Sequence, residues 1–129
     1  MDDGFRLLTN AKLFCWLPIL ADLLAPYPDV RIIVSSDWAR LFDDEALAKL
    51  LGPLCARFAG IVEVRGQGRR LDIERDVAKR GLTRWIALDD DDSCKRAKRF
   101  IRCNPQFGVS EERVRQRLAR TLANSLGRS

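Results

Sequence analysis

The sequence predicts an α/β fold built on a mainly parallel sheet. Short apolar runs of strand length alternate with segments in which apolar residues recur every three or four positions. The clearest strands are residues 30–34 and 84–88, and the clearest helix follows Ser110. Alternation at this short spacing is typical of parallel strands joined by helices. Because the 129 residues contain no linker, we expect one domain spanning residues 1–129.

The first half of the chain should contain two helices and a strand. Residues 1–12 carry turn residues without a strand pattern, so we expect them to be irregular. Leucines from Leu13 to Leu24 recur at helical spacing, and the helix should begin near Trp16 because Pro18 is tolerated only in a first turn. Residues 30–34 are β-branched and suit a strand buried on both faces. Asp43 or Asp44 can then cap a helix that ends before Gly52-Pro53.

The second half repeats this alternation. We expect, in order, a strand, a helix, a strand, a short strand and a final helix, at residues 60–64, 71–80, 84–88, 100–103 and 110–126. The two glycines at positions 66 and 68 are too few for a nucleotide-binding fingerprint and are expected to form a loop.

Composition narrows the functional classes. With 47% hydrophobic and 32% charged residues, the chain has the composition of a soluble globular protein. No apolar run reaches the about 20 residues of a membrane-spanning helix, and no leader pattern follows Met1, so we expect a cytoplasmic domain without membrane contact. The absence of histidine excludes Ser-His-Asp and Cys-His mechanisms within this chain. The cysteines lack metal-site spacing and should be reduced, partly buried thiols: Cys15, Cys55, Cys94 and Cys103.

The net charge of +5 comes partly from arginines that gather near the end of the chain: Arg113, Arg115, Arg117, Arg120 and Arg128. Basic clusters can mark nucleic-acid contact. Because no aromatic residues are interleaved for base stacking, we favour a solvated helix face. The three tryptophans are expected to be packing residues.

Polar side chains follow both of the clearest strands. Ser35 and Ser36 come after residues 30–34, and four aspartates, residues 89–92, come after residues 84–88. Parallel strands open their carboxyl ends on one edge, where ligands of such sheets bind. Hydroxyls beside carboxylates can hold a phosphate oxygen and Mg²⁺ together. Arg69 or Arg70, just before the helix at 71–80, could offset the phosphate charge.

Both polar clusters also have a simpler interpretation. Aspartates at 89–92 could be a solvated loop and helix cap, and the serines with Asp37 could form a turn. With Ser35 on the same sheet edge, we prefer Mg²⁺ binding by Asp89 or Asp90, which leaves the last two aspartates for capping.

The order of serine at one strand end, then arginine, then paired aspartates at a later strand end resembles the haloacid-dehalogenase-like (HAD) superfamily of phosphohydrolases. More narrowly, the segments VRIIVSSDW, WIALDDD and NPQFGVSEERV are similar to the branch associated with Swiss-Army-knife RNA repair proteins. The resemblance covers roughly Leu13 to Leu122. It implies a three-layer sandwich with a Rossmann-like sheet, and the chain's length leaves no room for a sizeable cap domain.

The resemblance also implies residue roles. Ser35, with Ser36 as the alternative, matches the position that binds the transferring phosphoryl oxygen. Arg70 or Arg69 matches the cation that steadies the phosphate, and Asp89 and Asp90 fall on the acidic motif that holds Mg²⁺. The implied activity is Mg²⁺-dependent hydrolysis of a phosphorylated substrate, and the link to RNA repair adds a nucleic-acid end as a candidate partner.

The attacking group of this family is the first Asp of a DxDG segment at the end of the central strand. The similar string here is Met1-Asp2-Asp3-Gly4, which places Asp3 at the acid/base position and Met1 at the nucleophile position. We therefore expect an impaired phosphohydrolase. The alternative is a non-catalytic remnant that acts as a binding or interaction module, with RNA association as one form of it.

The same departure raises a packing problem. In this fold the first strand lies between the strands that correspond to residues 30–34 and 84–88. Unpaired buried backbone groups cost about 1–3 kcal/mol each, so this place must be filled. A strand upstream of Met1 could fill it, Phe5 to Leu8 or another segment could fill it, or the two strands could pair directly. We favour the first of these.

Overall fold

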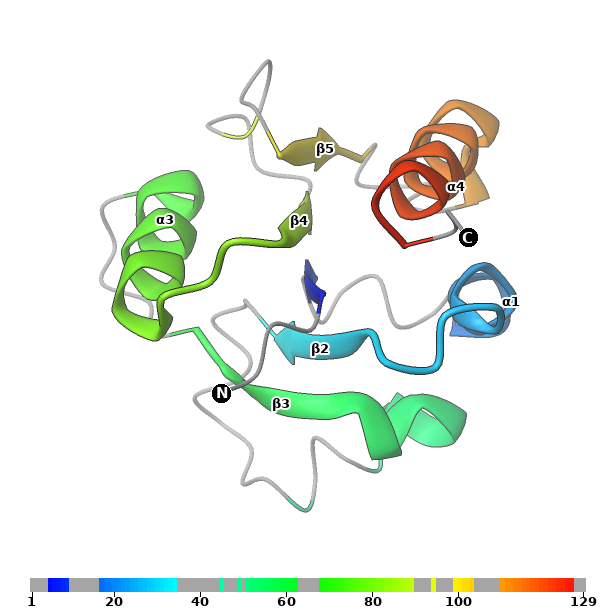
Figure 1. Ribbon diagram of the computed structural model, residues 1–129, viewed down its shortest axis with the longest axis horizontal. Helices are drawn as coiled ribbons and strands as arrows, with labels where there is room; N and C mark the ends of the chain where they lie inside the picture. The colour runs from blue at the N-terminus through cyan, green and yellow to red at the C-terminus, as the bar shows by residue number, and fades with distance from the viewer. Residues whose placement is uncertain are drawn as a thin grey trace.

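The computed structural model describes residues 5–9, 17–34, 45, 49, 51–62, 68–89, 94, 99–103 and 110–126. Within them, five parallel strands form a sheet in the order β3-β2-β1-β4-β5 (Figure 1). The elements are β1 (Arg6–Thr9), α1 (Leu17–Leu24), β2 (Arg31–Val34), the 3-10 helix η3 (Gly52–Arg57), β3 (Phe58–Ile61), α3 (Arg69–Arg80), β4 (Trp85–Asp89), β5 (Phe100–Arg102) and α4 (Glu112–Leu126). The predicted α/β fold is confirmed.

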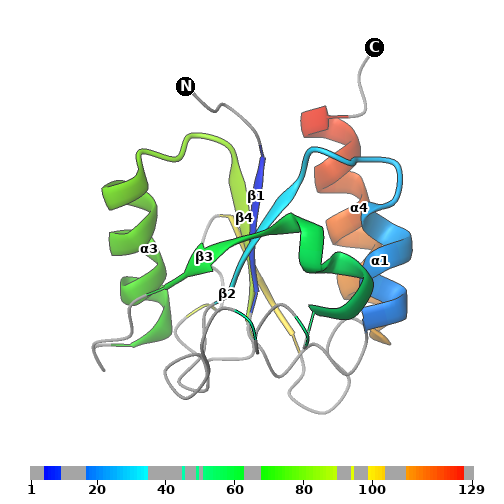
Figure 2. The ribbon, with the colours of Figure 1, turned by 90° about the horizontal axis from the view of Figure 1, so that it is seen from below.

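Helices cover both faces of the sheet, which gives three layers (Figure 2). Helix α3 packs on one face, where Ile73 and Val77 join Leu8 of β1 in a buried cluster. Helices α1 and α4 pack on the other face, where their leucines surround Leu7 of β1. Successive side chains of a strand point to opposite faces. The single strand β1 therefore contributes to both halves of the core.

The prediction that residues 1–12 contain no strand is wrong. Arg6–Thr9 forms β1 at the centre of the sheet, paired with β2 on one side and with β4 on the other. Leu7 and Leu8 are fully buried there. Of the three ways to fill the central place, the structure shows the second, in which the segment around Phe5 to Leu8 supplies the strand, and not the upstream strand that we favoured.

Other predicted elements are confirmed with shifted ends. Helix α3 begins at Arg69 and not at residue 71, because Gly68 accepts the first helical hydrogen bond from the Asp72 amide at 3.1 Å. Strand β4 extends through Asp89. Strand β3 begins at Phe58, earlier than expected, because it directly follows η3, whose first residue is Gly52 with a φ of 54°.

Several packing predictions are also confirmed. Cys94 and Cys103 are buried free thiols, and Trp85 packs edge-on against Phe100 with ring centroids 5.5 Å apart. Cys15, Trp16 and Trp38 lie outside the described residues, as does the Cys55 side chain.

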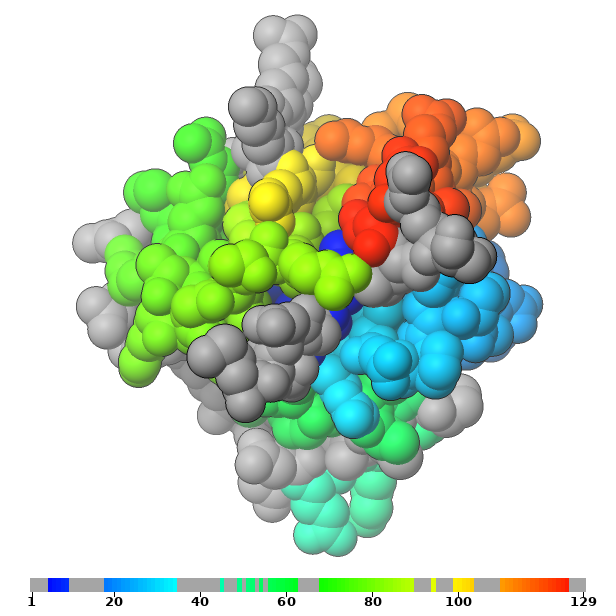
Figure 3. Space-filling view, viewed as in Figure 1, coloured from blue at the N-terminus to red at the C-terminus, as the bar shows by residue number. Residues whose placement is uncertain are grey.

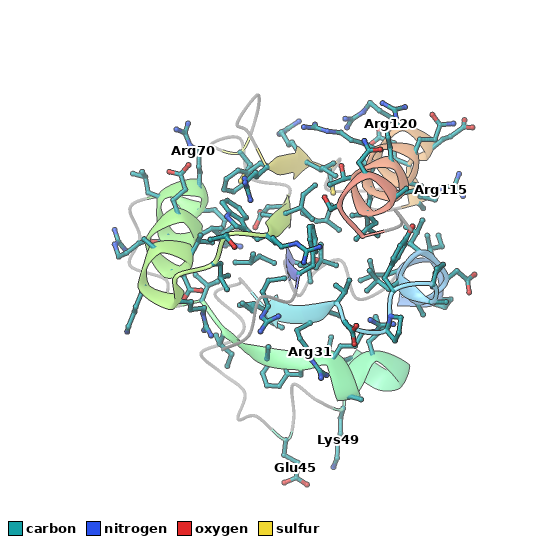
Figure 4. All side chains as sticks on the ribbon, in the orientation of Figure 1. Arg31, Glu45, Lys49, Arg70, Arg115 and Arg120 are labelled. Carbon is teal, nitrogen blue, oxygen red and sulfur yellow. The ribbon has the colours of Figure 1, made fainter. Side chains whose placement is uncertain are left out.

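Helix α4 has the predicted apolar stripe and basic outer face. Its stripe residues Val114, Leu118 and Leu122 are fully buried. Arg113, Arg117 and Arg120 are exposed and Arg115 is partly buried. Figure 4 shows Arg115 and Arg120 projecting from this helix away from the sheet. No helix in the described part of the chain is long and apolar enough to cross a membrane.

The turn between α1 and β2 is held by one guanidinium. Arg57 donates hydrogen bonds to the carbonyl oxygens of Leu24, Tyr27 and Val30, at 3.0, 2.7 and 3.0 Å. These carbonyls lie at the end of α1 and in the turn that follows, where those of Leu24 and Tyr27 also accept hydrogen bonds from the Tyr27 and Val30 amides, at 2.8 and 3.2 Å. Arg57 therefore sets the angle at which β2 enters the sheet.

The environment of Arg57 is costly for its charge. Burial, and then repulsion from Arg31, lower the pKa of the Arg57 guanidinium, while Asp29 partly offsets this by raising it. The hydrogen bonds from Arg57 to the three carbonyl oxygens must compensate for the free-energy cost of burying its charge. They therefore contribute to the stability of this turn.

Replacing Arg57 by Met should therefore lower the free energy of unfolding by about 2–4 kcal/mol, because hydrogen bonds to a charged group are worth about 1.5–3 kcal/mol each and water recovers part of the loss. Urea unfolding followed by circular dichroism measures this. Arg31→Met is the matched control: Arg31 donates one exposed bond, to Ala56 at 2.9 Å, and its loss should cost less than about 1 kcal/mol. Equal effects of the two substitutions would contradict the assignment.

Candidate functional site

The candidate site lies where the strand order changes direction. From β1 the chain builds outward through β2 to β3, and it then returns to the other side of β1 with β4 and β5. Ligands of open parallel sheets bind outside the carboxyl ends of the strands at such a switch point. The carboxyl ends gather at the lower edge of the molecule in Figure 2. The residues that close β1 and β4 at this edge are Thr9 and Asp89.

Asp89 is the last residue of β4 and its side chain is fully buried. Its backbone carbonyl accepts a hydrogen bond from the Cys103 amide at 2.8 Å, which fixes the end of β4 against β5. Asp89 Oδ2 lies 3.2 Å from Nη1 of Arg69 in the first turn of α3. The side chain of Arg69 is only 14% exposed. The aspartate that the sequence singled out is thus one half of a buried ion pair.

Arg69 and Arg70 are neighbours in the sequence but form ion pairs with different residues. Arg70 pairs with Glu74 on the outer side of α3, with 3.3 Å between Nε and Oε2. Figure 4 shows Arg70 pointing away from the sheet. Consecutive residues of a helix face directions about 100° apart, so only one of the two can face the strand ends. That residue is Arg69, and it is the described arginine nearest to the predicted role.

Thr9 closes the central strand. It is fully buried, and its hydroxyl oxygen has no hydrogen-bond partner among the described residues. Val34 and Leu88 lie beside it in register on the two neighbouring strands. By the alternation of side chains, Thr9 shares the face of Leu7, toward α1 and α4, whereas Asp89 meets α3 on the other face. The hydroxyl and the carboxylate therefore lie on opposite faces of the sheet.

Four of the predicted site residues lie outside the described residues: Asp3, Ser35, Ser36 and Asp90. Ser35 directly follows Val34, the last residue of β2, and Asp90 directly follows Asp89. Their roles, and the phosphate-binding role of Arg69 or Arg70, stay predictions.

The described residues do not fit a magnesium site. No group of three or more His, Cys, Asp or Glu among them could hold a metal ion. The carboxylate at the switch point, Asp89, is already paired with a guanidinium. Mg²⁺ usually needs one or two carboxylates that remain open to it together with waters and phosphate oxygens. Asp89 alone does not meet that need.

Thr9 is the residue at this edge that sequence reasoning missed. Arg6–Thr9 contains two leucines and no β-branched residue before Thr9, so its pattern does not favour a strand. The available signal was indirect. The strands at 30–34 and 84–88 both needed a strand to pair with, and the apolar segment from Phe5 to Leu8 was one candidate for it.

Together, the strand order 3-2-1-4-5, the three layers and the polar residues at the switch point define a domain with a HAD-like Rossmannoid fold. The chain belongs to the family described as the HAD domain in Swiss Army Knife RNA repair proteins, whose model matches residues 2–114. The resemblance noted in the sequence is thereby confirmed. No curated protein and no solved structure matches the chain.

The buried ion pair predicts unequal effects for the two arginines. Arg69→Met should lower the free energy of unfolding by about 3–5 kcal/mol, because it removes the cation paired with the fully buried carboxylate of Asp89. Arg70→Met is the matched control and should cost less than about 1 kcal/mol, because its ion pair is exposed. Urea unfolding of the three proteins gives both values.

The double variant Arg69→Met with Asp89→Leu should recover most of the lost stability, since both charges are then removed together. A double variant as unstable as Arg69→Met alone would contradict the ion-pair account.

Proposed function

We propose that this domain binds a phosphorylated ligand at the carboxyl edge of its sheet and does not hydrolyse phosphate esters by itself. The observation that supports this most strongly is the end of the central strand. The resemblance to the HAD superfamily implies an attacking carboxylate directly after that strand, and here the strand closes with Thr9.

The chemistry of the missing step is specific. A carboxylate attacks phosphorus, forms an aspartyl-phosphate and releases the alcohol, and water then cleaves the acyl phosphate. A threonine hydroxyl is a poor substitute because it needs a base to remove its proton. The chain has no histidine to act as that base.

The sequence around β1 supports the same view. Between Gly4 and Asp22 the chain has no acidic residue, and Asp22 already belongs to α1. A small change in the register of β1 would therefore still bring no carboxylate to its end. The string Asp2-Asp3-Gly4 precedes β1, whereas the family motif follows the central strand, so the proposal gives Asp3 no catalytic role.

Binding of an anion is supported by the start of α3. The twelve-residue helix begins at Arg69, after Gly68, whose position carries no side-chain cap. The first-turn amides of a helix lack partners within the helix, and the helix dipole favours negative charge near them. The Arg69 side chain stays 14% exposed while it holds Asp89. A phosphate group is the natural ligand for such an arrangement.

The proposal is tested first by hydrolysis. The purified chain, given p-nitrophenyl phosphate and excess Mg²⁺, should release nitrophenol no faster than buffer alone, and Asp89→Asn should behave in the same way. Turnover that is proportional to protein concentration and is abolished by Asp89→Asn would overturn the non-hydrolytic part of the proposal.

The binding part is tested with inorganic phosphate in a thermal unfolding assay. Phosphate should raise the melting temperature of the unaltered chain and of Arg70→Met, because a ligand that binds only the folded state stabilises it. It should not raise that of the Arg69→Met, Asp89→Leu double variant. An equal shift in all three proteins would place the phosphate elsewhere.

A further inference from the structure

A row of arginines runs along the exposed side of α4. Arg113, Arg117 and Arg120 are four and three residues apart, so their side chains leave the helix in directions within about 60° of one another. All three side chains are exposed. In Figure 3 the atoms of α4, in orange and red, lie at the outer surface, across the molecule from those of α3, in green. These three residues therefore form one accessible surface, which we call the α4 arginine row.

The helix that carries the α4 arginine row is fixed in place. On its inner side Val114, Leu118 and Leu122 are fully buried in the core cluster that α1 and the sheet share. Arg113 also ties the helix to the edge strand, because its Nη2 donates to the carbonyl oxygen of Arg102 in β5 at 2.9 Å. A ligand that contacts the row therefore meets a surface that is already ordered, which lowers the entropic cost of binding.

The charges of the row are only partly balanced within the described part of the chain. Arg113 Nε lies 3.4 Å from Glu111 Oε2, in an ion pair whose side chains are 57% and 32% exposed. Exposed pairs of this kind are weak and are screened by salt. Arg117 and Arg120 form no ion pair with any described residue. The row is therefore positive along its length, most clearly at these two arginines.

The spacing of these charges differs from that of an ordinary solvated helix face. Such faces usually place opposite charges three or four residues apart, which stabilises the helix. In the α4 arginine row like charges occupy those positions, and like charges at this spacing destabilise a helix. The exposure of the row agrees with the solvated face favoured from the sequence. A partner that carries negative charges along a line would relieve the repulsion within the row.

We propose that the α4 arginine row binds the phosphate backbone of a nucleic-acid strand. The row spans about 10 Å, because each residue advances a helix by about 1.5 Å. Each strand of a duplex carries one phosphate about every 3.4 Å of its axis, so about three phosphates fit along this length. Guanidinium groups pair with phosphate oxygens through two parallel N–H bonds. The number of cations, their spacing and their chemistry therefore suit one strand.

The composition of α4 favours a nucleic acid over a membrane surface. A helix that binds at a membrane interface presents large apolar side chains together with its basic ones. The exposed residues that accompany the row are small or polar: Gln116, Ala119, Ala123 and Asn124. The exposed large apolar side chain that the described residues include is Leu71, which lies on α3. The described part of α4 therefore offers charge without an apolar surface to insert.

The α4 arginine row lies apart from the carboxyl-edge site proposed above. Helix α4 packs on the face of the sheet opposite to α3, and α3 begins with Arg69. The inference therefore goes beyond the proposed function and does not rest on it. Contacts to phosphates carry no sequence information directly, so binding should be independent of base sequence.

Fluorescence anisotropy with a labelled single strand of about twelve nucleotides, oligouridylate or oligothymidylate, tests the proposal. The slope of log K against log salt concentration should be about −2, since each of three phosphate contacts to a single strand contributes about −0.7. Arg117→Gln and Arg120→Gln should each bring the slope closer to zero by about 0.7, and each should weaken binding about fivefold or more at about 50 mM salt.

Lys79→Gln is the matched control for net charge. Lys79 is exposed in the last turn of α3, so this variant removes one positive charge from the other face of the sheet. Its affinity should stay within about twofold of that of the unaltered chain, with the same salt slope. Arg117→Gln and Arg120→Gln should melt no lower than the unaltered chain, because each removes a like charge from α4. Circular dichroism checks this and separates lost binding from lost folding.

Binding of either strand with these variant effects supports the proposal, and a preference for one of them identifies the kind of strand. The proposal is overturned if neither strand binds, or if Lys79→Gln weakens binding as much as Arg117→Gln does. It is also overturned if polyglutamate displaces the labelled strand as effectively as the unlabelled strand does, which would indicate attraction to any polyanion. Binding to phosphatidylserine vesicles but to neither strand would assign the row to a membrane surface instead.

Discussion

The structure depends on one short strand that pairs on both sides. Arg6–Thr9 joins β2 and β4 in a parallel ladder, and neither of these buried strands has its inner edge satisfied without it. Unpaired buried backbone groups cost about 1–3 kcal/mol each, comparable in sum to the whole stability of a domain. The same strand supplies Leu7 to one half of the core and Leu8 to the other. The strand order of the sheet, the joining of the two halves of the core and the location of the switch point all depend on the position of this strand.

The end of that strand decides what the carboxyl edge can do. A fully buried aspartate is tolerated only with a partner, and Arg69 supplies it from the first turn of α3. The Asp89 carboxylate is thereby held in place at the end of β4, while the neighbouring central strand ends with the hydroxyl of Thr9. The proposed function is based on this edge, where Arg69 opens α3 and the described residues of the central strand end with a hydroxyl and carry no carboxylate.

Much of this could be predicted from the sequence, and the exceptions have physical reasons. The strand at 30–34 is largely β-branched and the strand at 84–88 is an apolar run after Arg84, so their pattern fixes them to within a residue. The pattern of apolar residues does not identify the central strand, because Leu7 and Leu8 suit a helix equally well. It is identified only because its two neighbouring strands need a strand to pair with. The choice between Arg69 and Arg70 depends on the residue at which α3 begins, which the backbone of Gly68 decides. The roles of Ser35, Ser36 and Asp90 stay predictions.

The central claim, that Arg6–Thr9 is the middle strand of the sheet, is open to a direct measurement. Amide hydrogen exchange followed by NMR reports how often each backbone hydrogen bond opens, and the most protected amides open only with global unfolding. The account predicts that the amides of Leu7 and Leu8 exchange among the slowest in the chain, together with those of Ile33 and Ala87 in the flanking strands. Rapid exchange of Leu7 and Leu8 beside protected flanking strands would contradict it.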